Sequence, residues 1–194
     1  MLDSTSEHEL LILGIGGQGI QLIGKTLAQA ATSSGRHAML AAEYGGEMRG
    51  GPSQSTVVIG ERPLRSLPIL ASAGSAIVMH DRFCGAVPER LRPGGLLVVN
   101  TSIVDPAAAG ESYRVGGLPA TDIARELGKP QTAGFIMLGA FNALTGLVTH
   151  EQLVEAMRSL LPPYRIEHAD SNAAALLAGS EAARDLELSA AVAA

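Results

Sequence analysis

ELLILGIGGQG, residues 9–19, joins an apolar run to a glycine-rich turn. Residues 9–15 are typical of a buried strand. Residues 17–34 carry apolar side chains at spacings of three and four, the period of a helix, and Gly35 stands where a helix C-cap glycine belongs. A strand, a glycine turn and a helix in this order predict the first unit of an α/β sheet.

The turn has the pattern G-x-G-x-x-G, in which each glycine has its own physical role. Gly14 is expected to allow the tight turn, Gly16 to let a ligand's phosphates approach the backbone, and Gly19 to let the helix pack closely on the strand. The free N–H groups and the helix dipole then favour an anion. Glu43 ends the next predicted strand, near the place of the ribose-binding acid in dinucleotide-binding folds. A bound dinucleotide and a turn without any ligand both stay open at this point.

The rest of the chain alternates strands and helices as far as residue 130 and is helical afterwards. Expected strands are a parallel one covered on both faces at 37–43, an excursion or hairpin at 55–60, and others at 75–80, 96–100 and 113–115. Expected helices are 83–91, ended by a turn at 93–95, then 120–127, 132–147, one from the capping box Thr149-x-x-Gln152 to Pro162, and one from 172. The order predicts an α/β fold with a Rossmann-like doubly wound, mostly parallel sheet and C-terminal covering helices. We expect a single domain over 1–194, with frayed ends at 1–8 and 188–194.

Charge and cysteine content narrow the class of protein. The formal net charge is −5, and Lys and Arg form no block, so neither nucleic acid nor an anionic membrane is an expected partner. Cys84 is the only cysteine, and one thiolate cannot form an internal disulfide or hold an iron–sulfur cluster. No apolar run approaches the roughly 18 residues of a membrane span, and the N-terminus is acidic. The expected location is a reducing cytoplasm.

A second motif, EYGGEMRGGPSQSTVVIG at residues 43–60, is more specific than the first. Paired glycines flank Glu47-Met48-Arg49 on both sides, which suggests a chain conformation that only glycine tolerates. An Arg held in this way suits bidentate contact with a carboxylate or phosphate of a ligand or of another subunit. A surface turn with a solvated Arg is the simpler alternative.

With both motifs, the sequence resembles the gamma subunit, or gamma-type domain, of the 2-oxoacid:acceptor (ferredoxin) oxidoreductases. The matching pieces occur in the family's order: GIGGQGIQLIGKTLAQAA, YGGEMRGGPSQSTVVIG, SAIVMH, GGLLVVN and GFIMLGAFNALTGLVTHEQLVEAM. Two departures are Tyr44-Gly45-Gly46, where many members have Tyr-Gly-Pro, and Thr132, where many have Asn.

The resemblance implies a subunit that is not catalytic alone. In such complexes a 2-oxoacid is oxidatively decarboxylated on thiamine diphosphate, electrons leave through iron–sulfur clusters, and the acyl group passes to coenzyme A. The implied partners are thiamine-binding alpha- and beta-type subunits, which use magnesium, and a ferredoxin-like delta-type subunit. The gamma-type chain is associated with coenzyme A binding and with closing the active site, and is expected to hold no cofactor or metal by itself.

The resemblance also implies which residues form the site, none of them with a covalent role. The candidates for ligand or interface contact are Gly16, Gly17, Gln18, Gly19, Lys25 and Arg49, with Tyr44 and Glu47 shaping the second loop. Lys25 stands two helical turns after the glycine loop, which argues against its reaching a ligand there.

Two other hypotheses about the function remain open. One is a free-standing NAD(P)-binding protein that uses Glu43 for the ribose, and the other is a structural subunit without a ligand. His80 and Asp81 end a predicted sheet strand, where α/β proteins bind ligands, although a strand-end hydrogen bond is the simpler explanation for them. Cys84 lies at a helix start whose dipole would lower a thiol pKa, but a packed, inert thiol is the simpler expectation.

Overall fold

The computed structural model describes residues 7–46, 50–65, 67–109 and 112–188. Its centre is a six-stranded sheet in the order β2-β3-β1-β4-β5-β6. The strands are β1 (His8–Ile15), β2 (His37–Tyr44), β3 (Pro52–Gly60), β4 (Ala73–Val78), β5 (Leu91–Asn100) and β6 (Arg114–Leu118). Only β3 runs against the others, because it pairs antiparallel with β1 and β2 while β1, β4, β5 and β6 pair in parallel. The expected mostly parallel sheet is confirmed.

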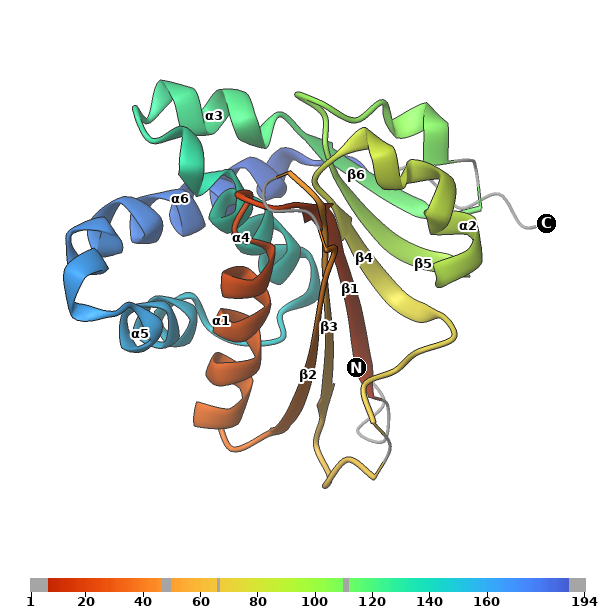
Figure 1. The fold of residues 1–194 in the computed structure, drawn as a ribbon, viewed down its shortest axis with the longest axis horizontal. Coiled ribbons are helices and arrows are strands. Elements are labelled where there is room, and N and C mark those ends of the chain that lie inside the picture. Colours follow the sequence, from red (N-terminus) through yellow and green to blue (C-terminus); the bar gives the residue numbers. More distant parts are fainter. Residues whose placement is uncertain (1–6, 47–49, 66, 110–111, 189–194) are drawn as a thin grey trace.

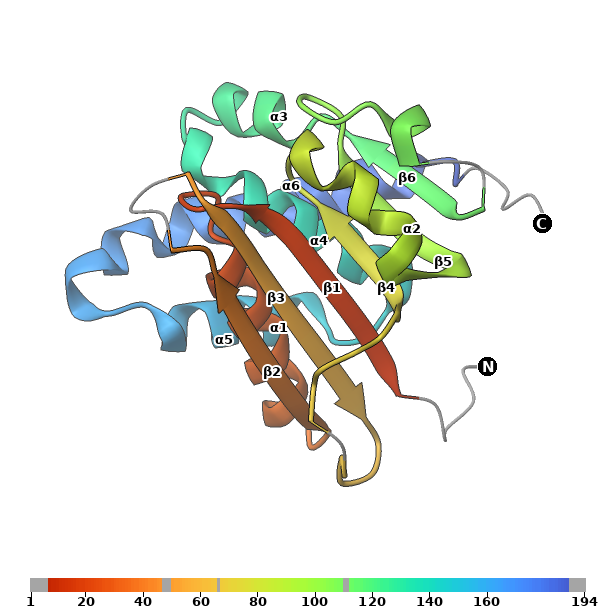
Figure 2. The same cartoon turned by 45° about the vertical axis from the view of Figure 1, so that its right-hand side comes forward.

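Helices cover both faces of this sheet, as a doubly wound fold requires (Figures 1 and 2). One face carries α1 (Ile20–Ser33), α4 (Ala133–Thr145), α5 (His150–Leu160) and α6 (Ala169–Ala182). The other carries the 3-10 helix η1 (Asp81–Ala86) and the short α2 (Val87–Arg90), whose apolar residues share a core with the outer sides of β1, β4 and β5. The helix α3 (Ala120–Glu126) lies near the carboxyl ends of the parallel strands. The expected α/β fold with C-terminal covering helices is confirmed.

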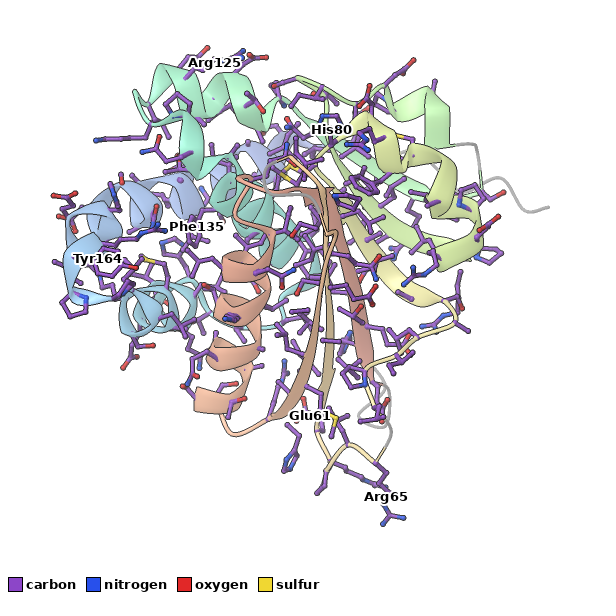
Figure 3. All side chains as sticks on the ribbon, viewed as in Figure 1. Glu61, Arg65, His80, Arg125, Phe135 and Tyr164 are labelled. Carbon is purple, nitrogen blue, oxygen red and sulfur yellow. The ribbon has the colours of Figure 1, made fainter. Side chains whose placement is uncertain are left out.

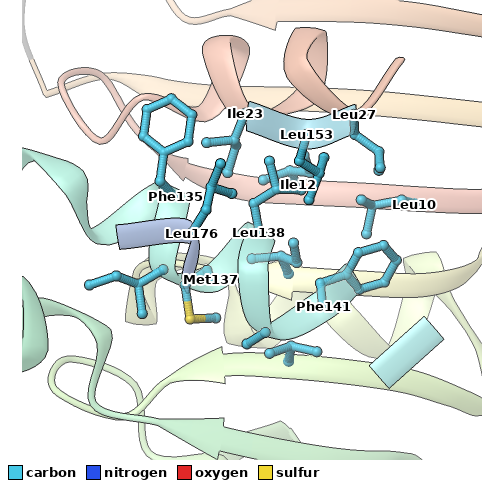
Figure 4. Close-up of a cluster of buried hydrophobic side chains, with 14 of the residues drawn as sticks. Leu10, Ile12, Ile23, Leu27, Phe135, Met137, Leu138, Phe141, Leu153 and Leu176 are labelled. Atoms are coloured by element: carbon cyan, nitrogen blue, oxygen red, sulfur yellow. The ribbon is translucent and has the colours of Figure 1, made fainter. Parts of the chain in front are cut away.

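The centre of the main core is α4, which is buried on every side over residues 133–142. Phe135, Met137, Leu138 and Phe141 of this helix meet side chains from β1, α1, α5 and α6 (Figure 4). A helix that is apolar all round must be enclosed, and α4 is enclosed by the sheet below it and by helices around it. This explains why the chain after residue 130 consists of covering helices.

Residues 37–43 were predicted to form a parallel strand that is covered on both faces. Both predictions are wrong. The segment belongs to β2, an edge strand that pairs only with β3, antiparallel, over its whole length. Its side chains are exposed or only half-buried where the structure describes them. The apolar composition misled because α1 covers just one face, with Ala38 and Leu40 packed on the main core.

The segment at 55–60, expected as an excursion or hairpin, forms a hairpin with β2 and is inserted as β3 between β2 and β1. The turn expected at 93–95 was wrong, because α2 ends at Arg90 and these residues belong to β5. They lie in an irregular stretch, between the pairing of Leu91 with Ala73 and that of Leu96 with Ser75. The capping box of Thr149 and Gln152 is confirmed at the start of α5.

Candidate functional site

The two glycine motifs and the end of β4 meet at one edge of the sheet, where the parallel strands have their carboxyl ends (Figure 1). The loop 15–19 follows β1, residues 45–46 follow β2, residues 50–51 precede β3, and the segment 79–82 follows β4. The chain leaves β1 towards α1 on one face and leaves β4 towards η1 and α2 on the other. That divergence is a topological switch point, the place where open α/β sheets bind ligands.

The glycines of the first loop have different roles from those expected. Gly19 has φ of 75° and a Cβ there would meet nothing within 4 Å, so it is needed for its left-handed backbone and not for helix packing. Gly17 is left-handed too, with φ of 99°. Close packing of α1 on the sheet comes instead from Gly24, where a Cβ would lie 2.3 Å from Ser55 Oγ of β3.

The second motif lies against Gly16 of the first. The Gly16 N–H donates to the carbonyl of Gly51 at 2.8 Å, and a Cβ on Gly16 would lie 3.5 Å from the backbone nitrogen of Gly50. In a dinucleotide-binding turn the middle glycine makes this room for a pyrophosphate. Here the backbone of residues 50–51 lies against it, so the two motifs form one composite structure.

Gln18 closes the turn with its own side chain. Its Oε1 accepts a hydrogen bond from the Ile15 N–H at 2.9 Å, and its Nε2 donates to the Met79 carbonyl at 3.1 Å. Met79 N–H in turn donates to the Leu13 carbonyl at 2.8 Å. The carboxamide therefore ties the glycine turn to the end of β4 across the switch point. Gly134 of α4 packs against this loop as well, since a Cβ there would lie 2.8 Å from the Gln18 carbonyl oxygen.

Gln21, which the sequence analysis did not single out, clamps the second motif to α1. Its Nε2 donates to the Gln54 carbonyl at 2.7 Å and lies 3.3 Å from Ser53 Oγ and 3.4 Å from the Glu43 carbonyl. Its buried Oε1 has no hydrogen-bond partner. The signal available in the sequence was a polar side chain in the first turn of the helix that follows a glycine loop.

The N-terminus of α1 has the properties of an anion site. It has no acidic residue in its first turn and no side-chain cap at Gly19. Among the described residues, nothing accepts a hydrogen bond from the N–H groups of residues 20–22. These unpaired donors stand at the positive end of the helix dipole, which favours a phosphate or carboxylate.

Arg82 and the pair of His80 and Asp81 add charge to the same edge. Arg82 is exposed and its Nη1 lies 3.4 Å from the Gly50 carbonyl, next to the second motif. The Nδ1 of His80, which is labelled in Figure 3, lies 2.7 Å from Asp81 Oδ1 and 3.4 Å from the backbone nitrogen of Arg82. Nδ1 can donate to the carboxylate or accept from the Arg82 N–H, but not both at once. His80 and Asp81 thus make the strand-end contacts that the simpler expectation foresaw.

The remaining predicted site residues are less closely placed or cannot be placed. Lys25 is exposed on α1, four residues after Gln21 and on the same side of the helix, so it stands one turn further from the loop. Arg49 and Glu47 lie outside the described residues, and of Tyr44 only the backbone, at the end of β2, is described.

The geometry argues against Glu43 as a ribose-binding acid. Glu43 pairs with Gln54 of β3, and Gln54 pairs with Leu13 of β1, so a whole antiparallel strand separates Glu43 from the glycine turn. In a dinucleotide-binding fold these two strands are neighbours. The Glu43 carboxylate accepts a hydrogen bond from Gln54 Nε2 at 3.1 Å instead.

Cys84 is buried, and burial together with the nearby carboxylates of Asp81 and Asp105 raises the pKa of its thiol. The packed thiol is therefore confirmed, the pKa shifts in the direction opposite to the one that a helix dipole would give, and the inertness of the thiol stays a prediction. We expect the native thiol to react with a thiol reagent at neutral pH at least roughly a hundredfold more slowly than the same chain in denaturant, because it is both protonated and covered. Equal rates measured in the two states would contradict this.

In the part of the chain that the structure describes, no three His, Cys, Asp or Glu side chains lie close enough together to hold a metal ion. Nor does any described helix have the length and apolar character needed to cross a membrane.

Comparison with known proteins assigns the chain to a family. The family model "Pyruvate ferredoxin/flavodoxin oxidoreductase" matches residues 9–182. The chain belongs to this family. The 2-oxoglutarate synthase subunit KorC of Methanocaldococcus jannaschii is 30% identical over 92% of this chain and 95% of its own length. The ketoisovalerate oxidoreductase subunit VorA of Methanothermobacter marburgensis is 40% identical over 78% of this chain, which spans only 32% of that protein.

A solved structure agrees with the sequence relatives. The gamma subunit of the keto/oxoacid ferredoxin oxidoreductase from Geobacter sulfurreducens superimposes with a TM-score of 0.76 at 27% identity, over 94% of this chain and 99% of that one. The resemblance to gamma subunits, drawn from the two glycine motifs, is confirmed. The relatives are subunits of multi-subunit oxidoreductases. The chain spans only about a third of the length of the two VorA relatives, 32% of one and 37% of the other.

Proposed function

We propose that this chain works as the gamma-type subunit of a 2-oxoacid:acceptor oxidoreductase and contributes the edge at loops 15–19 and 45–51 to coenzyme A binding. The observation that carries the proposal is the N-terminus of α1, which has unpaired N–H groups and no acid in its first turn and follows a glycine loop bonded to Gly51 of the second motif. Coenzyme A presents several phosphates, and unpaired amides at a helix N-terminus suit a phosphate. The residues present therefore fit the group.

Within this proposal, the residues divide into two kinds. Gly16, Gly17 and Gly19 give the backbone its shape, and Gln18 holds that shape through Ile15 and Met79. The amides at 20–22 and the guanidinium of Arg82 supply the positive field for a phosphate. Arg49 is proposed for a phosphate, carboxylate or intersubunit contact, as the family motif implies. Lys25 is the weakest candidate, because it lies one turn below Gln21.

The chemistry of decarboxylation and electron transfer is assigned to partner subunits. Thiamine diphosphate with magnesium would be held by alpha- and beta-type subunits, and iron–sulfur clusters by a delta-type subunit. One cysteine in the chain does not fit a cluster. What this chain would do is bind and orient the acyl acceptor and cover the active site of its partners.

The test is the assembled enzyme with Arg82→Ala. We expect the KM for coenzyme A in 2-oxoacid oxidation to rise roughly tenfold with kcat little changed, because a charge-assisted contact to the bound phosphate is lost without touching the reacting atoms. Arg125→Ala, at an exposed Arg of α3 paired with Asp122, is the control for charge. A KM that stays at the wild-type value in the Arg82 variant would remove coenzyme A from this edge.

Two other functions are separated by related measurements. A purely structural subunit predicts that Arg49→Ala and Arg82→Ala weaken assembly while the KM of any assembled enzyme stays constant. The NAD(P)-binding alternative predicts micromolar binding of a dinucleotide to the chain alone, abolished by Glu43→Ala. The inserted β3 speaks against that alternative.

A further inference from the structure

The outer edge of β2 is the longest open edge of the sheet. The strand runs over His37–Tyr44 and stands at the end of the sheet, with β3 as its only strand neighbour (Figure 2). Every strand has a second row of N–H and C=O groups, and at an edge this row is left for water or for another chain. An open edge of eight residues can therefore take a further strand.

Residues of an antiparallel strand alternate between those that bond to the neighbouring strand and those whose N–H and C=O groups point away from it, and this alternation identifies the outward groups of β2. Gly45 N–H donates to the Pro52 carbonyl, so this pair is a hydrogen-bonded one, and the odd-numbered residues of β2 face β3 in the same way. The N–H and C=O groups of Ala38, Leu40 and Ala42 then point away from the sheet. None of these groups has a hydrogen-bond partner among the described residues.

This edge lacks the features that usually protect one. It contains no Pro and no Lys, and its register with β3 is continuous from His37 to Tyr44, without a bulge. The opposite edge strand, β6, is shorter and has Leu186 and Leu188 packed beside its Gly116. The two edge strands of the sheet therefore differ, because β6 is short and partly covered whereas β2 is long and regular. Of the two, β2 is the one that can pair with a further strand.

We infer that β2 pairs antiparallel with β2 of a second copy of this chain, about a two-fold axis at Leu40. In this register the outward groups of Ala38 meet those of Ala42 in the second copy, so hydrogen-bonded residues face hydrogen-bonded residues. The same register puts His37 of one copy directly opposite Glu43 of the other, twice by symmetry. Shifting the register by two residues in either direction loses both of these pairs. Charge complementarity therefore selects a second copy as the occupant.

The side chains of β2 are compatible with this pairing of two β2 strands. His37 and Glu43 are both exposed, and the imidazole can donate to the carboxylate in either protonation state. Opposed side chains in an antiparallel pair lie on the same face, so the pair forms on the face away from α1, where Glu43 also meets Gln54. The small side chains of Ala38 and Ala42 leave the approach of the two backbones unhindered. This dimer does not depend on the coenzyme A proposal.

The experiment is the mass of the purified 194-residue chain by light scattering at high micromolar concentration. We expect roughly 40 kDa, twice the 19.9 kDa of one chain. Ala42→Pro should raise the dissociation constant at least roughly a hundredfold, because it removes an outward N–H at both ends of the joint without breaking a bond to β3. A monomeric wild-type chain, or a dimer that Ala42→Pro leaves unchanged, would overturn the inference.

A charge exchange tests the register itself. Glu43→Lys and His37→Glu should each weaken the dimer roughly tenfold, since each places like or unmatched charges opposite one another, and the double variant should restore it. Glu126→Lys, the same charge change on an exposed position of α3, is the control and should have no effect. Single variants that weaken the dimer without rescue in the double variant would overturn the register. Far-ultraviolet circular dichroism on each variant distinguishes loss of pairing from loss of fold.

Discussion

Gly139→Ala is expected to lower the free energy of unfolding by about 3 kcal/mol, the upper end of the cost of overpacking a core. Gly139 is in the middle of α4, where a Cβ would lie 2.1 Å from the carbonyl oxygen of Leu176 in α6. The neighbour is backbone, so it cannot move aside as a flexible side chain could. Because Ala is favoured over Gly by about 1 kcal/mol in a helix interior, the clash must overcome that gain as well.

The same contact exists in the reverse sense at Gly179 of α6, where a Cβ would lie 1.9 Å from the Ile136 carbonyl oxygen. The two helices therefore touch backbone to backbone at two points. Separating them would also pull Leu176 and Ile136, both fully buried, away from the core. Gly179→Ala should be as damaging as Gly139→Ala.

Chemical denaturation measures the free energy of unfolding of Gly139→Ala and Gly179→Ala, with Gly85→Ala as the control. Gly85 has no left-handed φ, and a Cβ there would meet nothing within 4 Å, so its replacement should be neutral or stabilise by up to about 1 kcal/mol. If Gly139→Ala and Gly85→Ala unfold at the same denaturant concentration, the close packing of α4 on α6 described here is wrong.

Gln18→Glu is expected to leave the fold in place and to lower the affinity for coenzyme A at least roughly a hundredfold, the largest functional effect of any single change at the site. A carboxylate keeps an acceptor for the Ile15 N–H but puts an oxygen where Nε2 donates to the Met79 carbonyl. Two acceptors then face each other, and a negative charge stands beside amides that are proposed to bind a phosphate.

Gln18→Ala separates these two causes. It leaves the Ile15 N–H and the buried Met79 carbonyl without their partner, at a cost of about 1–3 kcal/mol in stability, but adds no charge. We expect a smaller loss of affinity than in Gln18→Glu, and a larger loss of stability. Calorimetric titration of the assembled complexes with coenzyme A measures the first quantity, and thermal unfolding of the chain the second. Equal affinity in all three forms would show that the turn does not shape the ligand site.

The sequence was sufficient for the fold class and for the position of the glycine loop that follows β1, whereas the ligand-binding roles of the loop residues stay predictions. Apolar runs and helical spacing in the sequence predicted β1, α1 and the covering helices. A helix as apolar as residues 133–142 must be enclosed by other elements, so the sequence also predicts that α4 is covered. Glycine pairs in the sequence indicated both loops, because a left-handed φ such as that of Gly17 or Gly19 favours glycine. These features depend on local chemistry, which a sequence displays.

Features that depend on non-local pairing were not visible. The insertion of β3 between β2 and β1 reverses the partner and the burial of β2, and no local pattern at 37–43 shows it. The same insertion moves Glu43 away from the glycine turn. The hydrogen bond from Gln18 to Met79 joins residues 61 positions apart, so the sequence does not show it, and contact of Gln18 with a ligand or another subunit stays a prediction. Gln21 was overlooked because its partners at 43, 53 and 54 are brought near it only by the fold.

The N-terminus of α1, which follows the first glycine motif, is proposed to receive a phosphate of coenzyme A. Hydrogen exchange of the assembled complex, followed by mass spectrometry, tests this proposal directly. Without coenzyme A, the amides at residues 20–22 should exchange fast, because they have no acceptor among the described residues. With saturating coenzyme A, a peptide covering these amides should exchange at least roughly tenfold more slowly, while peptides of α5 stay unchanged. Exchange at residues 20–22 that is the same with and without coenzyme A would contradict the account.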